Sequence, residues 1–232
     1  MENLIECHSL TKCFGSKTAL SDINLNIQHG KITGLLGTNG SGKTTLMKLV
    51  AGLLMPTDGE ILINGLKPGT ETKRHVSYLP EKSYLSDWMK VTDIISYFND
   101  FYEDFDRQKA LDMLKSLNIS PTQQLKVMSK GTKEKVQLVL VMSRKAELYM
   151  LDEPIGGVDP AARDYIIKTI IANYSENSGV LISTHLITDI EPVLDDVVIL
   201  NNGVLKEFCG VDELREKNRK SVDAYFREVF RC

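Results

Sequence analysis

One short stretch, residues 37–44, limits the folds open to this chain more than any other feature. It has glycine at its first, fourth and sixth positions and closes with Lys43 and Thr44, which satisfies the pattern G-x-x-x-x-G-K-[ST]. An apolar run at 32–36 precedes it, and Leu46, Leu49 and Val50 follow at helical spacing. A strand, a glycine-rich loop and a helix in this order predict an α/β fold with a parallel sheet.

The residue types in this loop suit the binding of phosphate. Glycines let successive backbone N–H groups turn toward one anion, and the N-terminus of the following helix adds its dipole. We expect Lys43 to reach the β- and γ-phosphates, Thr44 to offer its hydroxyl to Mg²⁺, and Thr45 to contact the α-phosphate. The residues expected to line the phosphates are Gly37, Asn39, Gly40, Ser41, Gly42, Lys43, Thr44 and Thr45. A coincidental glycine turn is the alternative, and the flanking strand and helix argue against it.

A second polar group follows the apolar run at 148–151, where the chain continues with Asp152 and Glu153. Ligands gather at the carboxyl ends of the strands in a doubly wound sheet, so an acid there faces the phosphate loop. Asp152 is expected to hold Mg²⁺ through water, and Glu153 to polarise an attacking water. Alone, such an acidic pair is more typical of a solvated strand end, and the phosphate loop upstream favours the functional interpretation.

The apolar pattern predicts an α/β body interrupted by helices. Short strands are expected at 4–7, 23–27, 60–64, 76–79, 180–183, 197–200 and 204–208, and helices near 160–173 and 186–194. Between 91 and 145 the apolar residues recur at helical spacing, beginning at Val91 with Thr92 as a candidate cap. We therefore expect one domain with a core at 1–81 and 146–210, a helical lobe at 82–145 and a helical tail at 211–232. An apolar stripe in the tail is expected to dock on the core; a partner site is the alternative.

Composition excludes several classes of protein. With 232 residues and 42% apolar residues, the chain has enough material for a core and is not disordered. A net charge of −3 and a pI near 5.9 argue against broad nucleic-acid binding, although a local basic patch stays possible. No run approaches the ~20 apolar residues of a membrane span, and the N-terminus is not a signal peptide. The four cysteines form no zinc pattern and indicate reduced thiols in a cytosolic protein.

Further motifs, taken in order, make nearly the whole chain resemble the nucleotide-binding subunits of ATP-binding-cassette (ABC) transporters. Phe14 matches the aromatic residue that stacks on adenine, and Glu81 lies where the family has a glutamine that links Mg²⁺ to the membrane partner. Residues 128–132 align with the family signature Leu-Ser-Gly-Gly-Gln. Asp159 matches an aspartate that communicates across a dimer, and His185 matches the switch histidine.

The resemblance implies a P-loop NTPase (RecA-like) core with an antiparallel β lobe and an inserted helical lobe. It also implies an ATPase that works with ATP and Mg²⁺ as a head-to-tail homodimer. Each ATP would lie between the phosphate loop of one chain and Ser129, Lys130 and Gly131 of the other. Lys43 would neutralise charge on the transferred phosphoryl group, while Glu153 and His185 position the water. Thr44, Glu81 and Asp152 would serve the metal.

The partner implied is a separate transmembrane permease that docks near Glu81 and the helical lobe, without nucleic acid. The chain would then be a cytoplasmic protein bound peripherally at the inner face of the cell membrane. An apolar group at Tyr84, Leu85 and Trp88 is expected either in that docking groove or in the core of the lobe.

Each of these residues also has an ordinary structural interpretation. Phe14 can be a core residue, Ser129 a helix N-cap, and His185 a structural histidine. Asp159 followed by proline suits the start of a helix. Lys130 can contact the nucleotide across the dimer or lie in solvent.

Two departures from the family pattern matter. Glu81 keeps an oxygen ligand but loses the amide donor and adds a charge, and Lys130 and Thr132 replace a glycine and a glutamine in the signature. Both departures resemble a bacterial subgroup that serves small exporters, including GntR-regulated systems and exporters of amphipathic phenol-soluble-modulin peptides. The resemblance therefore implies export, with amphipathic peptides as a candidate cargo.

Two other classes of function were weighed against the transporter. A soluble ABC ATPase acting on DNA would need a long insertion between Lys43 and Asp152, and ribosomal members carry two cassettes in one chain. A P-loop GTPase or kinase is the third class, but the chain has no Asn-Lys-x-Asp motif. The order of motifs, more than the phosphate loop alone, favours the transporter subunit.

Overall fold

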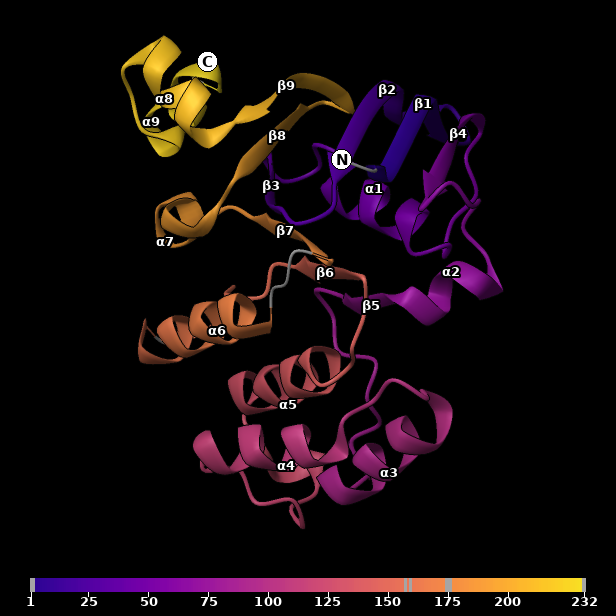
Figure 1. The fold of residues 1–232 in the computed structure, drawn as a ribbon, viewed down its shortest axis with the longest axis vertical. Helices are drawn as coiled ribbons and strands as arrows, with labels where there is room; N and C mark the ends of the chain where they lie inside the picture. The colour runs from indigo at the N-terminus through magenta and orange to yellow at the C-terminus, as the bar shows by residue number, and fades with distance from the viewer. Residues whose placement is uncertain (1–2, 157, 159, 174–176, 231–232) are drawn as a thin grey trace.

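The structure is a computed structural model that describes residues 3–156, 158, 160–173 and 177–230. A central α/β layer carries a three-stranded sheet beside its first helix and a lobe of helices at the opposite end (Figure 1). The two termini lie on the side away from the helical lobe.

Six strands form the central sheet in the order β5-β6-β7-β3-β8-β9. Their bounds are β3 Ile32–Leu36, β5 Val76–Leu79, β6 Leu148–Asp152, β7 Gly179–Thr184, β8 Asp196–Asn201 and β9 Val204–Gly210. Neighbours from β5 to β8 pair in parallel, and β9 pairs antiparallel to β8. Strands β3, β6 and β7 are buried along their whole length, as strands covered on both faces must be. The predicted parallel sheet is confirmed.

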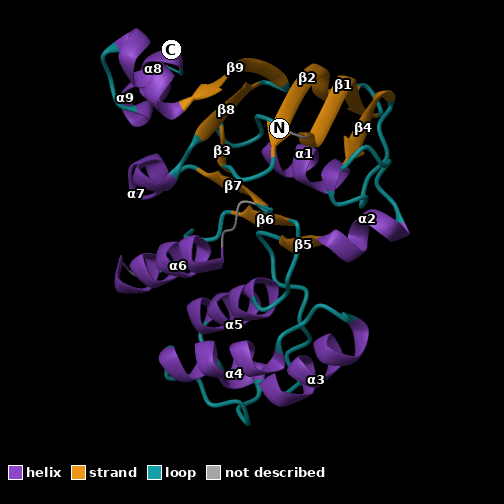
Figure 2. Ribbon diagram, in the orientation of Figure 1, coloured by secondary structure: helices purple, strands orange, loops and turns teal. Residues whose placement is uncertain are grey.

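The second sheet is antiparallel, with the order β2-β1-β4 (Figure 2). Its strands are β1 Asn3–Phe14, β2 Lys17–Gln28 and β4 Asp58–Ile63. Ile23, Leu25 and Ile27 are buried and alternate with exposed residues, so one face of this sheet points to the core. The first two strands are longer than the alternation predicts, because a hairpin with several register shifts continues their pairing to Phe14.

Helix α1 Lys43–Val50 lies between the two sheets and joins them (Figure 2). Leu46, Met47, Leu49 and Val50 are buried in one apolar cluster with residues of both sheets. The phosphate loop before α1 is thereby held against a rigid layer on each side. A short helix that the sequence does not predict, α2 Thr70–His75, precedes β5.

The other face of the central sheet is covered by the C-terminal half of the chain. The covering elements are α6 Pro160–Asn173, α7 Ile187–Ile190, the 3₁₀ helix η2 Glu191–Val193, α8 Val211–Asn218 and α9 Val222–Val229. Val222 is fully buried, and Tyr225, Phe226 and Phe230 pack against the same cluster. The prediction that the tail docks on the core is confirmed.

The helical lobe contains α3 Val91–Phe101, α4 Arg107–Ser116, the 3₁₀ helix η1 Leu125–Val127 and α5 Lys130–Met142. It has its own apolar cluster, to which α3, α4 and α5 contribute. Thr92 is not the cap of α3, so that prediction is wrong. Lys90 holds the cap position, and its backbone N–H donates to Asp93 Oδ2 at 3.2 Å.

One side chain joins the helical lobe to the central sheet. Arg144 is 3% exposed; its Nη1 donates to the Val76 carbonyl at 2.7 Å and its Nη2 to the Arg74 carbonyl. Its Nε donates to Asp104 at 3.0 Å, and its guanidinium lies 3.9 Å from the centre of the Tyr102 ring. The buried Arg144 guanidinium therefore binds both the start of β5 and the helical lobe.

Candidate active site

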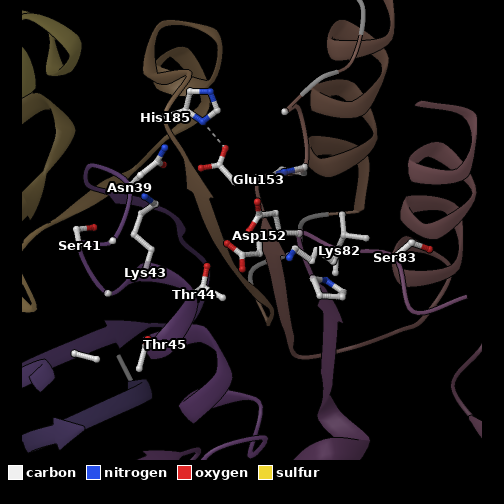
Figure 3. A pocket seen from close by; sticks show the side chains of 18 of the residues that line it. Asn39, Ser41, Lys43, Thr44, Thr45, Lys82, Ser83, Asp152, Glu153 and His185 are labelled. Carbon is white, nitrogen blue, oxygen red and sulfur yellow. Dashed lines mark hydrogen bonds and ion pairs between the residues drawn. The ribbon is translucent and has the colours of Figure 1, made fainter. Parts of the chain in front are cut away.

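A cleft of about 1160 Å³ opens at the carboxyl ends of the parallel strands. Residues of the phosphate loop, the segment after β5, the end of β6 and the end of β7 line it, and the first turns of α5 complete its wall. Figure 3 shows Lys43, Asp152, Glu153 and His185 around this space. The strand order thus brings together side chains that are far apart in the chain.

The phosphate loop is shaped by close backbone contacts. Gly42 has φ +110°, and a Cβ there would lie 2.8 Å from the Ala19 carbonyl oxygen, so only glycine fits without strain. The Gly203 N–H donates to the Ser41 carbonyl at 2.9 Å, and Ser41 N–H donates to Thr38 O at 3.1 Å. The Ser41 hydroxyl is buried and has no hydrogen-bond partner among the described residues. The loop is therefore anchored from outside while part of its polar interior stays unpaired.

Lys43 is the first residue of α1 and is 7% exposed, and its ammonium group turns back to the phosphate loop. Its Nζ donates to the carbonyls of Gly37 at 2.7 Å and Thr38 at 3.2 Å. Burial lowers the pKa of Lys43, and the charges of Glu153, Asp152 and Glu81 oppose that shift. Three carboxylates thus act on one ammonium group at the base of the cleft.

Asp152 closes β6 and is 2% exposed. One carboxylate oxygen, Oδ1, accepts a hydrogen bond from the Ser183 hydroxyl of the neighbouring strand. The other, Oδ2, is buried and makes no hydrogen bond of good geometry with any described residue, although the Tyr78 hydroxyl interacts with this carboxylate. A buried, unpaired carboxylate oxygen is costly unless something binds it. With the hydroxyl of Thr44 and the carboxylate of Glu81 lining the same cleft, the donors are the hard oxygens that Mg²⁺ prefers. These residues fit a magnesium ion.

Glu153 adopts φ +54°, a conformation that non-glycine residues seldom take. Its N–H donates to the Ser183 carbonyl at 3.0 Å, and its Oε2 lies 2.8 Å from His185 Nδ1 (Figure 3). Only 15% of the Glu153 side chain is exposed, against 57% for His185. The turn therefore holds the carboxylate inside the cleft with a histidine at its mouth.

Phe14 lies at the end of β1 and also lines the cleft. It is 49% exposed, so it is not a core residue, and Lys12 Nζ lies 5.2 Å from the centre of its ring. Asn39, Gly40 and Thr45 line the same cleft. An exposed aromatic ring beside a phosphate loop can stack on a nucleobase.

The signature-like segment is placed differently. Ser129 is the N-cap of α5, and its hydroxyl accepts from the Thr132 N–H at 3.2 Å. A Cβ at Gly131 would meet nothing within 4 Å, and the Lys130 side chain is 88% exposed. Lys130 lines the cleft, whereas Ser129 and Gly131 are not among the described residues that do. Gly37 is also absent from the cleft lining, the remaining described candidates all line one cleft, and Asp159 lies outside the residues that the structure describes.

The role of Ser183 is not predicted from the sequence. Its hydroxyl bonds Asp152, and its carbonyl accepts from the Glu153 N–H, because Asp152 and Ser183 are partners in the β6–β7 register. Parallel register between strands 30 residues apart leaves no local signal in the sequence. Of the apolar group beside Glu81, Leu85 packs in the helical lobe, whereas Tyr84 is 52% and Trp88 71% exposed.

The chain is similar to known proteins over most of its length. The family model described as ABC transporter matches residues 20–156. The ABC transporter ATP-binding protein YtrB of Bacillus subtilis (strain 168) is 29% identical over 97% of this chain and 78% of its own length. The bacitracin transport ATP-binding protein BcrA of Enterococcus faecalis is 32% identical over 96% of this chain and 74% of its own length.

Solved structures give the same picture of the fold. A structure described as the ATP binding subunit of an ABC transporter superposes with a TM-score of 0.90 at 28% identity, and the match covers 98% of this chain and 100% of that one. A dimeric cassette, MJ0796, described as a post-hydrolysis state bound to ADP and Pi, matches with a TM-score of 0.79 at 20% identity over 89% of this chain and 98% of that one. The second likeness bears on the fold alone.

Proposed function

This chain belongs to the ABC transporter family as an ATP-binding, ATP-hydrolysing subunit, and we propose that it drives a membrane exporter as a head-to-tail dimer that closes on two ATP molecules. One observation carries the proposal: Lys43, Asp152 and the Glu153–His185 pair surround a single cleft. The start of α5 meanwhile presents its signature-like residues to solvent.

The cleft supplies the groups that phosphoryl transfer requires. Lys43 leaves the Gly37 and Thr38 carbonyls to neutralise negative charge on the β- and γ-phosphates. Glu153 accepts a hydrogen bond from the attacking water and polarises it, and His185 fixes the orientation of the Glu153 carboxylate. Thr44, Asp152 and Glu81 would hold Mg²⁺, which when bound adds positive charge beside the transferred phosphoryl group. Phe14 stacks on adenine.

The other half of each site comes from the second chain. Ser129 offers its hydroxyl, Gly131 its open backbone and Lys130 its charge to the γ-phosphate across the dimer. Asp159 contributes to communication between the two sites. Loss of the γ-phosphate on hydrolysis removes the contact with the second chain, so the dimer opens.

The motion becomes useful when it moves a separate membrane subunit. Within the described residues, no helix combines the length and apolarity that crossing a bilayer requires. The permease would dock near Glu81 and the helical lobe, where Tyr84 and Trp88 expose apolar surface in the segment between β5 and α3. The chain then works in the cytoplasm at the inner face of the cell membrane. The relative named for bacitracin transport supports a transport role, and amphipathic peptides are the cargo we propose.

The test is the solution mass of Glu153→Gln with Mg-ATP and with Mg-ADP, beside the parent chain. A carboxamide at 153 keeps the shape of the side chain but cannot polarise water as the carboxylate does, so ATP should be bound and not hydrolysed. We expect a dimer in Mg-ATP and a monomer in Mg-ADP. A monomer in both, with ATP bound, would contradict closure by this chain alone and make Glu81 and the altered signature the suspects.

A further inference from the structure

One buried amide in the wall of the cleft has no partner. Gln137 is 2% exposed on α5, and its Nε2 makes no hydrogen bond with any described residue. Leaving such a donor unpaired costs about 1–3 kcal/mol. Because Gln137 also lines the cleft, the unpaired amide lies at a surface where the site can change on ligand binding.

The packing of α5 on β5 shows where this amide lies. The Ser77 hydroxyl of β5 donates to the Val141 carbonyl of α5 at 2.9 Å. Gln137 is one helical turn before Val141, about 6 Å along the helix, and Leu79 is two residues after Ser77, about 6.6 Å along the strand. Both steps lead toward the cleft, since Gln137 and Leu79 line it. Gln137 is therefore level with the end of β5, where the segment carrying Glu81 begins.

The segment after β5 contacts the helical lobe at its far end. At its far end, Asp87 pairs with Lys133 of α5 at 2.6 Å, and the Leu125 N–H donates to the Met89 carbonyl at 3.0 Å. At its near end, Glu81 is exposed and makes no hydrogen bond or ion pair within the described part of the chain. Its charge nevertheless acts on Lys43 and on the Tyr78 hydroxyl, so it lies close to the phosphate side of the cleft.

We infer that Gln137 Nε2 donates a hydrogen bond to the Glu81 carboxylate when the segment after β5 moves in over bound Mg-ATP. This inference rests on the proposed function and makes Gln137 a positioning residue, since it acts through Glu81. The proposed bond gives the Glu81 carboxylate an amide donor from α5, and both residues line the cleft. Because α5 begins at Ser129, the bond also ties the signature-like end of the helical lobe to the metal side of the site.

The test uses Gln137→Leu, which removes the polar atoms and leaves a branched apolar side chain that is one atom shorter. Because the variant has no unpaired buried amide, its melting temperature without nucleotide should be at least as high as the parent's. Its affinity for a fluorescent ATP analogue with Mg²⁺ and its kcat should both fall, together by roughly tenfold in kcat/KM. A gain or no change in stability combined with a loss at the site is a result that a merely structural glutamine would not give.

A double-mutant cycle separates the partner of Gln137 from its surroundings. In a Glu81→Ala background, Gln137→Leu should have no further effect on Mg-ATP affinity or turnover. An equal loss in that background would overturn the inference, as would a fall in melting temperature that accompanies the loss, or no loss at all. Gln108→Leu, an exposed glutamine of α4, is the matched control and should leave every readout unchanged.

The outcome is distinguishable from failure of the proposed function. If the parent binds and hydrolyses Mg-ATP and Glu153→Gln forms the ATP-dependent dimer, a silent Gln137→Leu contradicts this inference alone. If neither happens, the proposed function fails first.

Discussion

The two walls of the nucleotide cleft are built in opposite ways. On the phosphate-loop wall, Lys43 and Asp152 are buried and Glu153 is held by a strained turn against Ser183. On the α5 wall, Lys130 extends into solvent and Gly131 faces open space. The first wall is arranged within one chain before any ligand arrives, which suits chemistry that depends on fixed charges. The second wall is capped and exposed, which suits a surface that a second chain completes.

Because the two walls are built differently, they should respond differently to mutation. The largest loss of stability is expected where a side chain joins the helical lobe to the central sheet. Arg144 joins the helical lobe to the start of β5 through three backbone or carboxylate partners. Arg144→Ala leaves buried carbonyls and Asp104 unpaired, so we expect the free energy of unfolding to fall by about 3–5 kcal/mol. Urea denaturation measures this. Arg74→Ala, exposed in α2, should change it by less than about 0.5 kcal/mol. A loss below about 1 kcal/mol for Arg144→Ala would mean that the two regions do not depend on each other.

Lys43→Ala tests the pre-arranged wall itself. Because Lys43 is a buried cation on which Asp152, Glu153 and Glu81 all act, we expect ATP turnover to fall about 10²–10³-fold. The fold should survive, since the apolar face of α1 is unchanged. A phosphate-release assay at saturating ATP gives the rate, and circular dichroism checks the fold. Lys48→Ala, on the exposed face of the same helix, should retain the parent's activity. A similar loss in that control would point to α1 rather than to the site.

How much of this contrast is visible in the sequence depends on the range of the interactions. The phosphate loop, the acids after β6 and the histidine after β7 are local patterns at strand ends, so their common cleft follows from the strand–helix alternation. The partner of Asp152 could not be predicted, since it depends on the register between β6 and β7. The cap of α3 was mispredicted because the helix already begins at Val91, which puts the cap position at Lys90, whose N–H donates to the Asp93 side chain. Gln137 gives no signal in the sequence, since its unpaired state exists only where α5 packs on β5.

The N-terminus of helix α9 is a third case to compare with the two walls of the cleft. Glu191 of η2 accepts hydrogen bonds at the N-terminus of α9. Its carboxylate accepts from the N–H groups of Val222 at 3.0 Å and Asp223 at 3.3 Å, and also from Arg215 Nη2 at 2.9 Å. Burial raises the pKa of Glu191, but these hydrogen bonds and the Arg215 charge outweigh it and leave the pKa below its usual value. The stabilisation is therefore complete above the usual glutamate pKa of about 4.3 and is lost as the pH falls through the lower native value.

We therefore expect Glu191→Gln to lower the free energy of unfolding by about 1–2 kcal/mol at pH 7, with the difference from the parent shrinking below about pH 4. Denaturation curves between pH 7 and pH 3 measure both. Glu216→Gln on the exposed face of α8 is the control and should track the parent at each pH. A difference that persists unchanged at pH 3 would show that packing of the side chain, and not its charge, closes α9.

The smallest effects on stability are expected at the exposed start of α5, where mutations test whether the two walls differ as described. Ser129→Ala removes the cap that holds the Thr132 N–H and should cost about 1 kcal/mol of stability. Lys130→Ala removes no buried contact, only a 3.7 Å pair with Glu134, so stability should stay within a few tenths of a kcal/mol. If Lys130 meets ATP across a dimer, the ATP-dependent dimer of the Glu153→Gln chain should nevertheless weaken about threefold and lose part of its salt sensitivity, whereas Lys130→Arg should keep both.

Analytical ultracentrifugation at low and moderate salt measures the dimer, and Lys126→Ala in η1 removes the same charge outside the cleft as a control. Equal behaviour of Lys130→Ala and the control would assign Lys130 to solvent. The α5 wall would then act only through Ser129 and the backbone at Gly131. The two walls differ in how they are built, and this last measurement decides whether they also differ in carrying charge to the phosphates.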